Sequence, residues 1–259
     1  MIERERIQKR FLEYVSHYDL QDPKIALKVS HTGRVASLAE RIASESGFSR
    51  EEISLAWAMG MLHDIGRFEQ LRLYGTFQDA ISIDHALCGA EFLFQKGHIR
   101  EYLADNSYDH LLEKAILYHS VYRLPEGLTE EELKFCNLLR DADKIDILRV
   151  NVEVPLEEIY NASPEEVANA EVTEAVMEAF LEKHAINHAL KKTVIDRSVG
   201  HASLVFELVY PVSFAIVEEQ GYLQQVLTCH SRNEKTKQQY EILCACMWDF
   251  IKEKKKGKQ

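Results

Sequence analysis

The stretch Leu62-His63-Asp64-Ile65-Gly66-Arg67 decides how this sequence is interpreted. It closes an apolar run that begins at Ser49-Arg50-Glu51-Glu52, a capping-box pattern typical of a helix start. Neighbouring residues of a regular helix point about 100° apart, so His63 and Asp64 can face one ion only where the helix ends. Imidazole and carboxylate together suit Mn, Fe or Zn. A single His-Asp pair also arises by chance, so the remaining histidines carry the argument.

Three further histidines lie at positions that favour burial. His31 is in register with apolar residues of an expected helix over residues 22–46, and His119 shares a face with apolar residues of an expected helix over 109–119. His85 begins another expected helix, where Gly89 one turn later leaves space beside the ring. A histidine on an apolar face is either a hydrogen-bonded core residue or a metal ligand, and position alone leaves both readings open.

Two carboxylates occur together in Arg140-Asp141-Ala142-Asp143-Lys144. Asp143 shares a helix face with Leu139 and Ile147, so its charge needs a cation or a metal. Asp141 lies on a second apolar face of the same helix. Periodicity therefore does not choose between the two.

In type and chain order, these residues resemble the metal-binding pattern of the HD-domain superfamily of metal-dependent phosphohydrolases. That pattern is a helical His, a His-Asp pair at a helix end and a distant Asp, with two further histidines in between in members that bind two metals. It is matched by His31, His63-Asp64, His85, His119 and the Asp of Asp141-Ala142-Asp143-Lys144. The resemblance covers roughly residues 20–150 and says little about residues 151–259.

The resemblance implies a ligand set for divalent ions, expected to be two, with Fe or Mn favoured and Zn, Co, Ni or Mg also accepted. Asp64 would bridge both ions. Asp143 is taken over Asp141 because the family ligand directly precedes a basic residue, and Asp141 then orients a ligand imidazole. The first ion would be held by His31, His63, Asp64 and Asp143, and the second by Asp64, His85 and His119.

The resemblance also implies the chemistry. A metal-activated hydroxide would cleave a nucleotide or another small phosphate ester or diester, with Asp64 at the reacting centre. Arg67 and Lys144 would bind the phosphate oxygens and assist catalysis. Tyr74, in an expected loop over residues 68–78, would contribute a substrate-binding wall or lid.

Two other functions stay open at this point. A few HD-fold enzymes use the same ligand order to hold two irons and activate oxygen, so the ligands alone do not exclude a diiron oxygenase. A non-catalytic nucleotide-binding module with the same fold is the second alternative, although every expected ligand type is present.

Composition limits the partners. Lys and Arg number 31 and Asp and Glu 42, a net charge of −11, which opposes extended nucleic-acid binding. The most apolar stretch, residues 202–217, contains Glu207 and Pro211 and is too short to cross a membrane. Five scattered cysteines and a charged N-terminus favour a cytoplasmic location. The expected partner is a small phosphate substrate, and the sequence does not indicate an oligomeric state.

Low glycine and proline contents, 11 and 5 residues, favour an all-α protein. We expect an HD-domain helical bundle over residues 1–150 and a C-terminal helical extension over 151–259. The extension is expected to pack on the first part because residues 202–217 are too apolar for exposure to water. Helices are expected over residues 2–14, 22–46, 49–66, 84–96, 109–119, 130–150, from 164, 171–183, 200–229 and 233–255.

Overall fold

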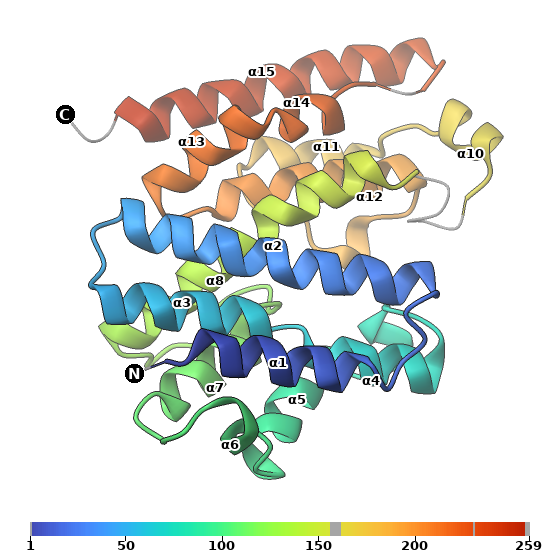
Figure 1. Cartoon of the computed structure of the whole chain (residues 1–259). Helices are drawn as coiled ribbons and strands as arrows, with labels where there is room; N and C mark the ends of the chain where they lie inside the picture. The colour runs from blue at the N-terminus through green and yellow to red at the C-terminus, as the bar shows by residue number, and fades with distance from the viewer. Residues whose placement is uncertain (1, 156–161, 230, 257–259) are drawn as a thin grey trace. The chain divides into compact units, whose positions relative to one another are not determined.

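The computed structural model describes residues 2–155, 162–229 and 231–256, and these residues form helices and loops without a strand (Figure 1). The all-α expectation is confirmed. The chain divides into two compact units, Met1–Asp143 and Lys144–Gln259, and the division lies inside helix α8 (Glu130–Glu153). The helix expected over 130–150 is confirmed by α8, which continues to Glu153. The domain boundary expected at 150 and the packing of residues 151–259 on the first part stay predictions.

The first unit is built around the pair α2 and α3, with α3 lying between α2 and α1 (Figure 1). The start of α2 follows from Asp22, whose carboxylate accepts the backbone N–H of Lys24, and the start of α3 from the capping box of Ser49 and Glu52. Its helices are α1 (Arg4–Val15), α2 (Pro23–Glu45), α3 (Arg50–Leu62), α4 (Ile65–Tyr74), α5 (His85–Ala90), α6 (Ile99–Tyr102), α7 (Asp109–Tyr118) and the first part of α8.

Two glycines set the close approach of helices around the histidines. A Cβ on Gly60 of α3 would lie 2.5 Å from the Cα of Ala36 on α2. A Cβ on Gly66 of α4 would lie 2.2 Å from the backbone oxygen of His85 on α5. Both distances are far below any van der Waals contact, so each crossing requires glycine. These crossings bring the elements that carry His31, His63 and His85 together.

Residues 65–74 differ from the sequence-based expectation. The loop expected over 68–78 is wrong, because α4 occupies Ile65–Tyr74 and ends at Gly75 with φ +67°. Ile65, Phe68 and Leu71 are buried at helical spacing on one face of α4. The irregular segment is therefore shorter, from Gly75 to Asp84, and contains a single 3₁₀ turn, η1 (Asp79–Ile81).

The second unit contains several short helices and one long one. The long helix expected over 200–229 is wrong, because Pro211 starts one helix and Gly221, with φ +68°, ends it. The helix expected over 233–255 is confirmed by α15. The elements are the end of α8, α10 (Pro164–Asn169), α11 (Glu174–Leu181), η3 (His188–Leu190), α12 (Val194–Ala202), η4 (Ser203–Glu207), α13 (Pro211–Gln220), α14 (Tyr222–Val226) and α15 (Glu234–Lys256).

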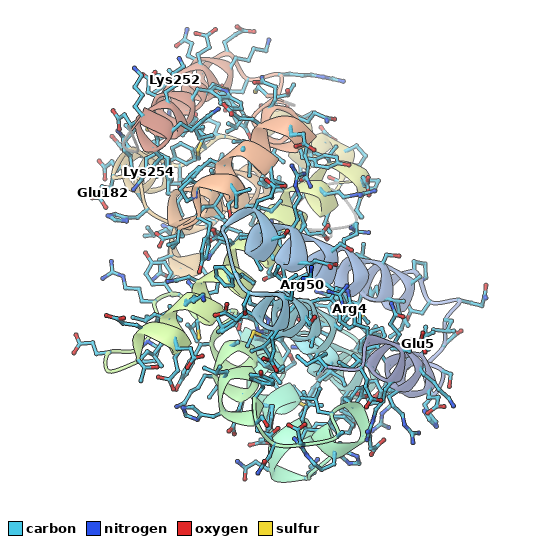
Figure 2. All side chains as sticks on the ribbon, turned by 60° about the vertical axis from the view of Figure 1, so that its left-hand side comes forward. Arg4, Glu5, Arg50, Glu182, Lys252 and Lys254 are labelled. Atoms are coloured by element: carbon cyan, nitrogen blue, oxygen red, sulfur yellow. The ribbon has the colours of Figure 1, made fainter. Side chains whose placement is uncertain are left out.

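The second unit has its own apolar core, in which the rings of Phe180, Phe206 and Phe250 pack edge to face. Charged side chains such as Glu182, Lys252 and Lys254 project from its helices, as those of Glu5 and Arg50 do in the first unit (Figure 2). Within the described parts of the chain, no helix has both the length and the apolar character needed to cross a membrane.

Candidate metal centre

The turn between α3 and α4 places His63 and Asp64 side by side. His63 keeps helical backbone angles, whereas Asp64 leaves them, with φ −102° and ψ 15°. Asp64 is the N-cap residue of α4, yet its carboxylate accepts no capping hydrogen bond from that helix. The break turns the two neighbouring side chains toward one region, as the sequence argument required, and leaves the carboxylate available for other partners.

One oxygen of Asp64 faces the first group of expected ligands. Asp64 Oδ2 lies 3.6 Å from Nε2 of His31 and 3.5 Å from Nε2 of His63. Asp143 Oδ1 lies 3.1 Å from His31 Nε2 and 3.8 Å from His63 Nε2. The ligand atoms of His31, His63 and Asp64 lie within 4.8 Å of one another, a spacing that one ion can span. Asp143 thus joins this group, while Asp141 is buried elsewhere on α8.

The other oxygen of Asp64 faces the second group. Asp64 Oδ1 lies 3.4 Å from Nε2 of His85 and 3.6 Å from Nε2 of His119. The two imidazole nitrogens are 3.0 Å apart. Asp64 is therefore common to both groups and gives a different oxygen to each. Figure 1 shows the elements that supply them, with α5 and α7 carrying the second group.

In three of the rings the outer nitrogen, Nδ1, lies at hydrogen-bond distance from an acceptor. His63 Nδ1 lies 2.8 Å from the carbonyl oxygen of Gly60, His119 Nδ1 lies 2.7 Å from that of Ile116, and His85 Nδ1 lies 2.6 Å from Asp79 Oδ2. Carbonyl and carboxylate oxygens only accept, so in each neutral ring the Nδ1–H donates and Nε2 keeps its lone pair. The inner nitrogens, the Nε2 atoms, thereby have lone pairs that could bind a metal ion.

Burial keeps His63 and His85 neutral, and neighbouring groups keep the carboxylates of Asp64 and Asp143 ionised. Loss of hydration lowers the pKa of His63 to about 3 and that of His85 to about 4. Burial alone would raise the pKa of Asp64, but Lys28, His63, His119 and Arg67 together hold it well below its ordinary value. The hydrogen bond and charge of His31 likewise outweigh burial at Asp143 and lower its pKa. At neutral pH His63 and His85 are therefore neutral and Asp64 and Asp143 are anionic, the protonation states that metal binding requires.

These residues fit divalent metal ions. His63 Nε2 is fully buried and has no hydrogen-bond donor, since the atoms it faces are carboxylate oxygens. The lone pairs of His85 and His119 also face each other. Such lone pairs repel one another in a low-dielectric interior unless a cation lies among them. Nitrogen and oxygen donors of this kind are typical of sites for Mn, Fe, Co, Ni or Zn.

Asp79 is a site residue that sequence reasoning missed. Its Oδ2 accepts from His85 Nδ1 at 2.6 Å, and its Oδ1 accepts from Arg67 Nη1 and Gln70 Nε2, each at 2.7 Å. Burial would raise the pKa of Asp79, but the hydrogen bond from His85 and the charge of Arg67 lower it to about 2. A carboxylate that receives the outer N–H of a ligand histidine fixes the ring and raises its basicity. The only sequence signal was an acidic residue six positions before His85.

Asp84 completes a third group with Asp79 and His85 whose spacing would also suit a metal. Its carboxylate, however, accepts the backbone N–H groups of Ala86 and Leu87 at 2.9 and 3.0 Å. Asp84 is therefore the N-cap of α5, and its carboxylate is used to start the helix that carries His85.

The expected phosphate-binding residues lie in different surroundings. Arg67 Nε lies 3.6 Å from Asp64 Oδ1, on the side of the second group. Lys144 directly follows Asp143 on α8, is buried, and opens the second unit. Tyr74 ends α4, is 49% exposed, and makes no hydrogen bond, ion pair or ring contact with the described cluster residues. The substrate-binding roles of Arg67, Lys144 and Tyr74 stay predictions.

An all-helical bundle that gathers histidines around one shared carboxylate defines a metal-binding helical domain. Residues 29–148 match the family model of the HD domain, a range that contains all six candidate ligands. Residues 29–148 are thus similar to the HD domain of the superfamily of metal-dependent phosphohydrolases. Comparison with curated proteins and with solved structures gives no match.

Proposed function

We propose that the protein is a phosphohydrolase with two divalent metal ions that cleaves a nucleotide or another small phosphate ester or diester. The observation that carries this proposal is the sharing of Asp64. One of its oxygens faces His31 and His63, and the other faces His85 and His119. A carboxylate shared in this way suits a pair of ions better than a single ion.

The first ion would be held by His31, His63, Asp64 and Asp143, and the second by Asp64, His85 and His119. When bound, such ions lower the pKa of a coordinated water and offset the negative charge of a phosphate. The preference for Fe or Mn, with Zn, Co, Ni or Mg as alternatives, is part of the proposal.

The side chains of this chain contribute orientation and exclusion of water. His63, His85 and His119 have their outer N–H groups fixed by acceptors, so the rings need no rearrangement when they bind an ion. All three rings and Asp64 are buried, which limits competition from bulk water. Arg67 would bind a phosphate oxygen beside the second ion, since its guanidinium faces Asp64 Oδ1. Lys144 would provide a second cation, and Tyr74 an outer wall of the substrate site.

Metal analysis of the intact protein is the first test. The protein is purified anaerobically without added metal and analysed by mass spectrometry, and we expect about two Fe or Mn ions per chain. About one ion per chain would replace this proposal with a mononuclear hydrolase. No bound metal even after reconstitution would support a non-catalytic binding module instead.

Activity assays then test the reaction. The metal-loaded protein is assayed with bis(p-nitrophenyl) phosphate, p-nitrophenyl phosphate and a panel of nucleotides, with the Asp64→Ala variant as the control. We expect phosphate release or diester cleavage that depends on metal and on Asp64. Oxygen uptake is measured in parallel, because consumption of oxygen without hydrolysis would identify a diiron oxygenase.

A further inference from the structure

Lys28 holds the charge of Asp64 on the side of the first ligand group. Its Nζ lies 2.6 Å from Asp64 Oδ2, the same oxygen that faces His31 and His63. Lys28 lies three residues before His31 on α2, on the same side of the helix. Its side chain is 16% exposed, so part of it reaches solvent while the ammonium contacts the buried carboxylate.

Each oxygen of Asp64 is therefore matched by one cationic side chain. Lys28 lies at Oδ2, and Arg67 lies 3.6 Å from Oδ1. Both cations also lie near the ring of Phe77, with Lys28 Nζ 5.4 Å and Arg67 Cζ 5.9 Å from the ring centroid. The half-buried Phe77 thus marks a place where two positive charges gather beside the cluster.

The two cations are held very differently. Arg67 Nη1 donates to Asp79 Oδ1, to the backbone oxygen of Phe77 and to Gln70 Oε1, at 2.7 to 2.8 Å. Lys28 Nζ has one ion-pair partner among the described residues, the oxygen of Asp64. A flexible four-carbon stem with one ion pair can move, whereas a guanidinium fixed by three acceptors cannot do so without losing them.

An ammonium and a divalent ion at the same carboxylate oxygen repel each other, and this repulsion is strong in a buried site. Lys28 would yield more readily than Arg67, because it loses a single ion pair rather than three hydrogen bonds. Its charge then needs a new partner near the cluster. The phosphoryl oxygens of a bound substrate are anions in reach of a freed lysine, and lysine is a common phosphate ligand.

We propose that Lys28 is a substrate-binding residue that balances Asp64 while the first ion is absent and binds the phosphoryl group once that ion is present. Together with Arg67 it would select a substrate whose phosphate carries unesterified, negatively charged oxygens on both sides of the metal pair. This inference rests on the proposed phosphohydrolase function. A purely structural Lys28 would stabilise the ion-free protein and have no effect on phosphate affinity.

The test compares three variants of the full chain. Lys28→Met removes the charge and keeps the length of the side chain. Lys28→Arg keeps the charge. Lys24→Met is the matched control, since Lys24 lies one turn earlier on α2, is exposed, and its ammonium donates to the backbone oxygen of Gly75 at 3.2 Å, away from Asp64. Calorimetry measures Mn²⁺ binding to the ion-free proteins, and then inorganic phosphate binding to the Mn²⁺-loaded proteins.

We expect Lys28→Met to bind Mn²⁺ at least as tightly as the unaltered protein, because the competing ammonium is gone. Its Mn²⁺-loaded form should bind phosphate about tenfold or more weakly. Lys28→Arg should keep most of the phosphate affinity, and Lys24→Met should change neither measurement. The phosphate measurement uses the metal-loaded state, so weaker folding of the ion-free Lys28→Met protein does not obscure it.

Equal phosphate affinities of Lys28→Met and the unaltered protein would overturn the inference about Lys28 and leave the proposed function intact. A parallel loss of Mn²⁺ and phosphate affinity would also overturn it, because Lys28 would then support the metal site. If the unaltered, Mn²⁺-loaded protein binds no phosphate and hydrolyses no phosphate ester, the proposed function fails, and the inference fails with it.

Discussion

The imidazole rings of His85 and His119 face each other with their Nε2 atoms 3.0 Å apart. Their outer N–H groups donate to Asp79 and to the backbone oxygen of Ile116, so both inner nitrogens present lone pairs to the same region. The two rings come from different helices, α5 and α7. The fold thus brings together two imidazole nitrogens that together suit a cation, beside an oxygen of Asp64.

Removal of His85 should eliminate the second metal site and leave the first one intact. His85→Ala eliminates one ligand of the second ion, while His31, His63 and Asp143 remain beside Asp64. We expect metal content to fall from about two ions per chain to about one, with diester hydrolysis reduced about a hundredfold or more. His110→Ala is the control, because His110 is exposed and pairs with Glu132. Retention of both ions by His85→Ala would rule out this ligand assignment.

Removal of Asp64 should eliminate both ions. Asp64→Ala takes away the one carboxylate that faces both histidine groups. We expect metal analysis to find no tightly bound ion and hydrolysis to fall to background. Circular dichroism confirms that the variant is folded. Normal occupancy of either site in a folded Asp64→Ala protein would contradict the shared role of this carboxylate.

Asp79 should act on the second ion through His85. Asp79→Asn keeps the shape of the side chain but weakens the acceptor for His85 Nδ1–H, and it removes the charge that binds Arg67. We expect Mn²⁺ affinity of the second site to fall about 10- to 100-fold, with little change at the first site. Titration with Mn²⁺ measures both sites. Asp84→Asn is the matched control, because asparagine also caps α5, and this variant should bind both ions normally.

A methyl group at Gly66 should disturb the second ligand group by steric conflict. The added Cβ would lie 2.2 Å from the backbone oxygen of His85 and 2.6 Å from the backbone nitrogen of Gly89. We expect Gly66→Ala to lower the free energy of unfolding by about 1–3 kcal/mol or more and to weaken binding of the second ion. Gly33→Ala should leave stability equal or about 0.5–1 kcal/mol higher, because nothing lies within 4 Å of its Cβ and alanine favours the helix. Urea unfolding compares the two.

The ion-free protein should lose stability as the solution becomes mildly acidic. Burial lowers the pKa of His63 to about 3 and that of His85 to about 4, from an ordinary 6.5. Below pH 6.5 the unfolded chain binds protons that the folded chain does not, so the free energy of unfolding falls until the pH reaches the folded pKa. The lowered pKa of His85 contributes about 3 kcal/mol to the free energy of unfolding, and more than half of this contribution is lost by about pH 5.

Urea unfolding in EDTA at about pH 7.5 and about pH 5 measures this dependence. The His85→Gln variant should show a shallower dependence than the unaltered protein. Asp79 contributes in a lower window, because its folded pKa of about 2 lies below the ordinary 3.8, and its stabilisation is lost only as the pH falls below about 4. A pH-independent stability between about pH 5 and about pH 7.5 would contradict the burial of neutral histidines.

The sequence indicated which residues the fold would bring together at the candidate metal centre, because residues of fixed type occur in a fixed chain order. His63 and Asp64 are adjacent at a helix end, and the structure makes the break at Asp64 that the argument required. The choice of Asp143 over Asp141 came from the resemblance alone. The structure places Asp143 beside His31 and His63, a contact that periodicity did not predict.

Other features were missed because they depend on tertiary contacts. Gly66 suggested a helix end, but α4 begins at Ile65, and the glycine is needed for the approach of α5. The contacts of Asp79 depend on the path of residues 75–84 over α4 and α5, which no local pattern encodes. The helix expected over 200–229 is wrong for a local reason. The prediction gave more weight to the hydrophobicity of this region than to its helix breakers, Pro211 and Gly221, which divide it.

The carboxylate of Asp79 binds Arg67 with one oxygen and His85 with the other. On the proposed function, a phosphate that shares the guanidinium of Arg67 would weaken the hold of Arg67 on Asp79 and leave more negative charge facing the Nδ1–H of His85. The Nε2 atom of His85 would then become a stronger base and a better ligand. By thermodynamic reciprocity, the phosphate and an ion at His85 would each raise the affinity of the other. Substrate arrival would therefore favour loading of the second ion, and product departure would favour its release.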